Sequence, residues 1–173
     1  MSRQFLYWAI SMSFIFIYGC ATNMTIDPKV TQIDNIEFRI KGKIIYEGNK
    51  EYLPRVLTED PASNAGLTFE YTYNVIYGKH DVPSAVALLN PLTIAGFPTG
   101  ENTTTVIGKL DVMKRGEVMK SYNSTCILEK TQNLFSERTF TDLRRQGLLA
   151  VRNNLEVQIH LDKNYLEKLL SSE

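Results

Sequence analysis

The feature that most constrains the fold is strict alternation of apolar and polar residues in separate stretches of the sequence. Such alternation is typical of a β-strand with one face in the core and one face in water. The stretches are 36–46, 67–77 and 104–113. A fourth strand, from about 118 to 129, follows a turn in which Gly116 can take the positive φ of a tight hairpin. We therefore expect an antiparallel sheet of four or more strands.

The hydrophobic period changes from two to that of a helix after Gln132. Thr139 and Asp142 can form a capping box at its start. The helically spaced residues are Phe140, Leu143, Gly147, Leu148, Val151, Leu155 and Ile159. They predict an amphipathic helix over about 137–160, with a short second helix or a continuation after it. The expected fold class is α+β, with this C-terminal helix covering one face of the sheet.

The first twenty residues differ in kind from the rest. Arg3 is their only charged side chain, and an uncharged, largely apolar run of sixteen residues extends from Gln4 to Gly19. A basic start, an apolar centre and a small-residue end are typical of a secretory signal. The run is shorter than the roughly 20 residues that span a bilayer.

The signal ends Ile17-Tyr18-Gly19-Cys20, which resembles the lipobox of bacterial lipoproteins. In that family Gly or Ala precedes the cysteine, an aliphatic residue lies three positions before it, and the thiol carries diacylglycerol. The resemblance implies cleavage before Cys20 and attachment to a membrane through lipid on Cys20. Ala21 follows the cysteine, which by the same resemblance favours the outer membrane, facing the periplasm. The alternatives are an uncleaved N-terminal anchor and an ordinary signal whose nearby cysteine is accidental.

The sequence divides into three parts on this interpretation. Residues 1–19 are the signal peptide, 20–33 a flexible lipidated tether, and 34–173 a single α+β domain. With Cys20 lipidated, Cys126 has no partner for an internal disulfide and is expected to act as a small buried hydrophobe. If Cys20 were not lipidated, a Cys20–Cys126 bridge would be the alternative.

Residues 82–98 are apolar but interrupted by prolines, too short and too broken for a membrane helix. They could pack under the sheet, or form a loop that contacts a membrane or a protein partner. For the second case the candidate contact residues are Leu88, Leu89, Leu92, Ile94 and Phe97.

Aromatic residues recur on one face of the strand at 67–77. They are Phe69, Tyr71, Tyr73 and Tyr77. Such a stripe fills the core of a sheet or lines the pocket of a small apolar ligand.

The sequence holds no recognisable catalytic constellation. His80, Asp81 and Ser84 are too close in sequence for a triad, so an enzyme built on them would need a third polar group from elsewhere. No metal-ligand spacing and no phosphate-binding glycine loop are present, so we expect no cofactor and no metal. The 19 basic residues balance 19 acidic ones, which gives no indication of a nucleic-acid partner.

The resulting hypothesis is a non-catalytic, lipid-anchored envelope protein. It would bind another envelope component or assist its assembly. A periplasm-facing carrier or sensor of a small apolar ligand is the alternative. If the source were eukaryotic, the sequons at Asn23, Asn102 and Asn123 would instead indicate a secreted glycoprotein.

Overall fold

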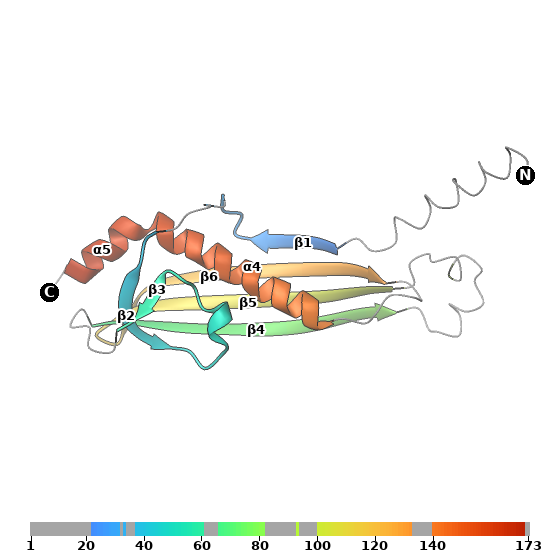
Figure 1. Ribbon diagram of the computed structural model, residues 1–173, viewed down its shortest axis with the longest axis horizontal. Helices are drawn as coiled ribbons and strands as arrows, with labels where there is room; N and C mark the ends of the chain where they lie inside the picture. Colours follow the sequence, from blue (N-terminus) through green and yellow to red (C-terminus); the bar gives the residue numbers. More distant parts are fainter. Residues whose placement is uncertain are drawn as a thin grey trace, which may run out of the picture.

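Three long antiparallel strands form the centre of the fold in this computed structural model (Figure 1). They are β4 (Leu67–Asp81), β5 (Gly100–Lys114) and β6 (Glu117–Gln132). The structure describes residues 22–31, 33, 37–60, 66–81, 93, 100–132 and 140–171. Within these residues the sheet has six strands in the order β1-β6-β5-β4-β2-β3.

The sheet is mixed, so the prediction of an antiparallel sheet is wrong on one side. β2 (Ile40–Ile45) runs parallel to both of its neighbours, β4 and β3 (Leu57–Glu59). The short 3₁₀ helix η2 (Lys50–Tyr52) lies between β2 and β3. This connection brings the chain back to the end of the sheet where β2 begins, so that β3 runs parallel to β2. Apolar alternation identifies a strand but does not indicate whether its neighbours run parallel or antiparallel to it. The direction of β2 therefore could not be predicted from its sequence. The α+β class is confirmed.

A sixth strand lies where the sequence predicted a flexible tether. β1 (Thr22–Asp27) pairs antiparallel with β6, from Thr22 opposite Lys130 to Asp27 opposite Thr125. The predicted tether over 20–33 is therefore wrong for these six residues, and the domain begins no later than Thr22 rather than at 34. Only Met24 and Ile26 mark the apolar face of this short edge strand, which is too little for a periodic signal.

The C-terminal helix covers one face of the long strands, as predicted. α4 (Phe140–Leu161) crosses β5 and β6, and α5 (Lys163–Ser171) follows it after a one-residue break (Figure 1). The sheet-facing side chains of the two helices are buried. They include Leu143, Leu148, Val151, Leu155, Ile159 and Leu166.

Gly147 allows α4 to approach the sheet closely. A Cβ built at Gly147 would lie 2.6 Å from Val106 Cγ2 and 2.8 Å from Leu128 Cδ1. Val106 and Leu128 are both fully buried, so no space exists for a methyl group at this crossing.

The hairpin between β5 and β6 has the predicted tight turn, with two residues between the strands. Arg115 and Gly116 both have positive φ, 54° and 86°. Positive φ at both central positions is the type I′ geometry, whose twist matches that of the flanking strands.

The aromatic stripe of β4 is part of the core at Phe69 and Tyr71, whereas Tyr77 at its other end is 50% exposed. Phe69 and Tyr71 are 1% and 2% exposed. The centroid of the Tyr71 ring lies 5.1 Å from that of Tyr46, the residue directly after β2. Tyr73 also contacts Tyr46 and packs edge-on against Tyr52 of η2. The interpretation of this stripe as a ligand pocket is therefore not supported: at this end its rings are in contact with one another and with the core.

Candidate functional site

A cavity of about 640 Å³ lies beside α4, on the side of the helix that faces β1. Its apolar lining comes from the N-terminal segment, the segment before β3 and α4: Met24, Ile26, Val30, Ile33, Val56, Leu149, Ala150 and Val157. Its polar lining is Arg39, Arg55, Gln146, Asn153, Asn154 and Glu156. We call this cavity the α4 groove. Its size is within the range of pockets that bind small molecules.

The N-terminal wall of the α4 groove is attached to the helix by side-chain amides. Asn154 Nδ2 donates to the backbone carbonyl of Pro28 at 2.8 Å, directly after β1. Gln158 Nε2 donates to Asn154 Oδ1 at 2.7 Å and to the carbonyl of Asn123 on β6 at 2.9 Å. Asn154 is 5% exposed, so the loss of these bonds would leave a buried amide unsatisfied. These bonds hold the chain just after β1, at Pro28, against α4.

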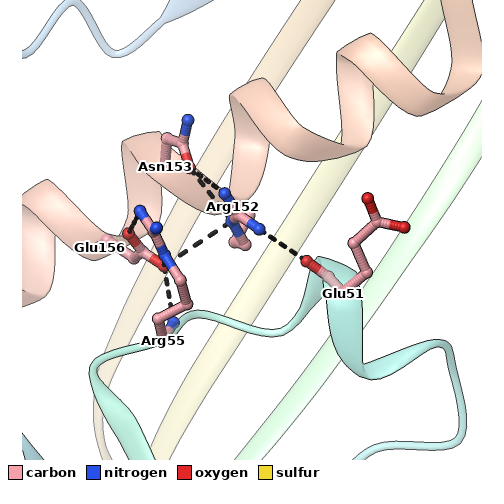
Figure 2. A network of polar contacts seen from close by, with 5 residues as sticks. All are labelled: Glu51, Arg55, Arg152, Asn153 and Glu156. Atoms are coloured by element: carbon pink, nitrogen blue, oxygen red, sulfur yellow. Dashed lines mark hydrogen bonds and ion pairs between the residues drawn. The ribbon is translucent and has the colours of Figure 1, made fainter.

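The opposite wall is held by a buried carboxylate on α4 (Figure 2). Glu156, 2% exposed, accepts a hydrogen bond from the backbone N–H of Arg55 at 2.6 Å. The guanidinium of Arg55 also binds it with both prongs, Nε to Oε1 at 3.1 Å and Nη2 to Oε2 at 3.0 Å. This hydrogen bond to Glu156 raises the pKa of Arg55 above its usual value. Both carboxylate oxygens are engaged in joining the segment before β3 to the helix.

Arg152 completes the network on the inner side. Its Nη1 donates to the backbone carbonyl of Glu51 at 2.7 Å, and its Nη2 to Asn153 Oδ1 at 2.7 Å. Its Nε lies 3.7 Å from Glu156 Oε1. Burial lowers the pKa of Arg152 from its usual value, while the charge of Glu156 acts in the opposite direction. The Arg55 charge is thus balanced by Glu156, and Arg39 is the other cation on the groove lining. One such cation suits an apolar ligand with a single anionic group.

The residues that the sequence singled out are not gathered at this groove. Cys20, Leu88, Leu89, Leu92, Ile94 and Phe97 lie outside the described residues. His80 and Asp81 are the last two residues of β4 and pair with Glu101 and Gly100. Cys126 is a free thiol on β6, and it is fully buried, as expected. Asn102 of the second sequon is 1% exposed, which leaves no space for a glycan.

Two further observations concern the described part of the chain. No three His, Cys, Asp or Glu side chains gather there as metal ligands would. Neither α4 nor α5 is long and apolar enough to cross a bilayer.

Sequence reasoning missed the Arg55–Glu156 pair. The available signal was Glu156 itself, an acidic residue between Leu155 and Val157, which are both buried on α4. A charged residue at such a position needs a partner. Nothing in the sequence, however, indicates that this partner lies 101 positions earlier.

No protein-family model matches this sequence, and a search of curated proteins found no relative.

Proposed function

We propose that this chain is a lipid-anchored bacterial envelope protein that binds another envelope component, or assists its assembly, without catalysing a reaction. The observation that carries the proposal is the position of the lipobox relative to the fold. Only Ala21 separates Cys20 from Thr22, the first residue of β1. A processing site at this point would remove the signal and leave a chain whose second residue after the lipidated cysteine begins the sheet.

The contact surface in this proposal includes the apolar stretch between β4 and β5, represented by Leu88, Leu89, Leu92, Ile94 and Phe97. Its apolar composition supports contact with a membrane or a protein partner. Two of the buried charged groups join segments of the fold: the Glu156 carboxylate binds Arg55, and the Arg152 guanidinium binds the carbonyl of Glu51.

The anchor is tested by intact mass. The full chain is expressed in a Gram-negative host, with and without an inhibitor of the lipoprotein signal peptidase, and the membrane-bound form is weighed. We expect loss of residues 1–19 and a gain of acyl mass on Cys20. Because Trp8 is the only tryptophan, the processed protein also loses tryptophan fluorescence. A membrane form that retains Trp8 and carries no acyl mass would contradict the proposal.

A second candidate function is that of a carrier or sensor of a small apolar ligand, favoured by the α4 groove. The apolar walls, with Arg39 on the lining, suit a fatty-acid-like molecule. The test is binding of a dansyl-labelled fatty acid to processed protein carrying Leu149→Trp in the groove wall. The matched control is Leu161→Trp, at an α4 position that is 64% exposed. The two positions are about 18 Å apart along α4, so energy transfer to the dansyl group is expected to be stronger in the Leu149→Trp variant than in the Leu161→Trp variant. Equal or absent transfer would exclude this groove as the site.

A further inference from the structure

The start of β1 lies at the end of the sheet where β4 ends, β5 begins and β6 ends. Thr22 pairs with Lys130 on β6, and Lys130 pairs in turn with Asn102 on β5. This row is two residues from the terminal pair, Gly100 and Gln132. Figure 1 shows the tail of β1 on the same side as the arrowhead of β6. We call this side, defined by Thr22, Gly100 and Gln132, the anchor end.

The distance from Cys20 to the anchor end is short. Two residues of fully extended chain reach at most about 7 Å. Lipid on Cys20 would therefore be attached within that distance of the Thr22 Cα atom. A flexible tether through 33 would have had a mean reach of roughly 20 Å and no fixed direction. The pairing of β1 with β6 replaces that freedom with a defined starting point.

The opposite end of the sheet carries the hairpin and the second helix. Arg115 and Gly116 form the turn there, and Lys114 Nζ donates to the carbonyl of Leu169 on α5 at 2.5 Å. A strand of 15 residues such as β5 spans about 50 Å. The two ends of the sheet are thus far enough apart that one can lie at a membrane while the other does not.

The connection between β4 and β5 begins and ends at the anchor end, because Asp81 pairs with Gly100. By sequence this connection is the apolar stretch 82–98. The charged residues in the sequence of the last rows of β4, β5 and β6 are Lys79 and Lys130 against Asp81, Glu101 and Glu129. They give no net positive charge, so attraction to anionic lipid would not hold this end at a bilayer.

We propose that β1 holds the anchor end of the sheet next to the bilayer, so that the hairpin end lies farther from the membrane. The partner is the lipid surface itself, and anionic headgroups are not required. The proposal rests on the proposed lipidation of Cys20. It adds an orientation, which the predicted flexible tether would not have given.

The experiment uses two labelling sites on the same strand. Glu129→Cys and Glu117→Cys replace exposed glutamates near the anchor end and at the hairpin end of β6, about 40 Å apart. Native Cys126 is fully buried and does not compete for the label. The acylated full-length product is labelled with a fluorophore and reconstituted into phosphatidylcholine–phosphatidylethanolamine vesicles containing a headgroup nitroxide lipid. We expect quenching at 129 to exceed that at 117 by at least threefold, and to be unchanged when anionic lipid is added.

Equal quenching at the two positions, or stronger quenching at 117, would overturn the orientation. A third variant carries a twelve-residue Gly-Ser linker between Ala21 and Thr22. Quenching at 129 should fall by at least half in it, and no fall would overturn the role of β1. Intact mass separates the two proposals: acylated protein with equal quenching contradicts only the orientation, whereas absence of acyl mass contradicts both.

Discussion

Glu156 on α4 binds Arg55 by three hydrogen bonds, one from the backbone N–H and two from the guanidinium. The two residues are 101 positions apart in the sequence. Their side chains differ in exposure, since 65% of the Arg55 side chain but only 3% of the Glu156 side chain is accessible. The pair joins the parallel side of the sheet, through the segment before β3, to the helix that covers the antiparallel side.

Replacing the carboxylate should destabilise the domain measurably. In Glu156→Gln the side chain loses its charge and places an amide donor against the donors of Arg55 and Arg152. We expect a loss of about 2–3 kcal/mol in the free energy of unfolding, below the upper range for buried pairs because Arg55 is largely solvated. Urea unfolding of the processed protein provides the measurement.

The matched control for that variant is Glu167→Gln on α5, where the glutamate is exposed. It should change the free energy of unfolding by less than about 0.5 kcal/mol. If both variants had the same small effect, the buried pair would not contribute to stability.

Gly147→Ala tests the close contact between α4 and the sheet. Alanine favours a helix over glycine by about 1 kcal/mol, so the variant would be stabilising if space were available. The new Cβ instead meets Val106 and Leu128, both fully buried, and overpacking of this kind costs about 1–3 kcal/mol. We expect a net loss of about 1 kcal/mol or more in thermal or urea unfolding.

The neighbouring Gln146→Ala serves as its control, because Gln146 is an exposed residue of the same helix. It should leave stability unchanged or slightly increased. A stabilised Gly147→Ala would show that the helix can move away from β5 at no cost.

The type I′ turn predicts opposite effects at adjacent positions. Arg115 has a φ of 54°, a conformation that asparagine adopts more readily, so Arg115→Asn should stabilise the hairpin by a few tenths of a kcal/mol. Gly116→Val places a β-branched side chain at a φ of 86° and should cost more than about 1 kcal/mol. Changes of the same sign in the two variants, measured by thermal unfolding, would contradict this turn geometry.

The stability of the domain should fall above about pH 9. Burial raises the pKa of the Cys126 thiol from 9.0 to about 11, and burial with neighbouring tyrosines raises that of Tyr46 from 10.0 to about 12. Between the two values of each group the unfolded chain has released a proton that the folded chain retains. Alkali therefore favours the unfolded state, and the contribution of each group is fully present only below its unfolded value.

Urea unfolding between pH 7.5 and 10.5 measures this dependence, with the Cys126→Ala variant as comparison. We expect a flat profile to about pH 9 and then a decline, whose onset in Cys126→Ala moves toward pH 10, where the tyrosines of the unfolded chain ionise. Alkylation of the folded wild type at pH 8 should be slow for the same reason. A profile that rises with pH would exclude the assigned shifts.

Local pattern was sufficient for the elements with long, uninterrupted periods. The apolar period repeats many times along β4, β5 and α4. The hairpin is indicated by Gly116, which readily adopts the positive φ of a tight turn. Even there the ends were imprecise: the strand expected from 36 begins at Ile40, and β6 extends to Gln132. End positions depend on pairing partners, which periodicity does not contain.

Non-local pairing accounts for what the sequence did not reveal. β1 is too short for a convincing period and is a strand because β6 provides its hydrogen-bond partners. The parallel direction of β2 and the α4 groove arise from how distant segments meet. Arg55 reads as an ordinary surface cation until its contact with Glu156 is known.

The pairing of β1 with β6 also sets an order in time. Chains are synthesised from the N-terminus, and the residues that β1 needs, Thr125 to Lys130, follow it by about one hundred positions. At about 5–20 residues per second, Thr22–Asp27 waits roughly 5–20 s for its partner to exist. During that interval Thr22–Asp27 has no sheet to join, so the proposed cleavage before Cys20 would act next to an unpaired segment. The first strand in the sequence is thus the last to pair in the sheet. Under the proposed lipidation, this pairing would follow cleavage and would then fix the chain next to Cys20.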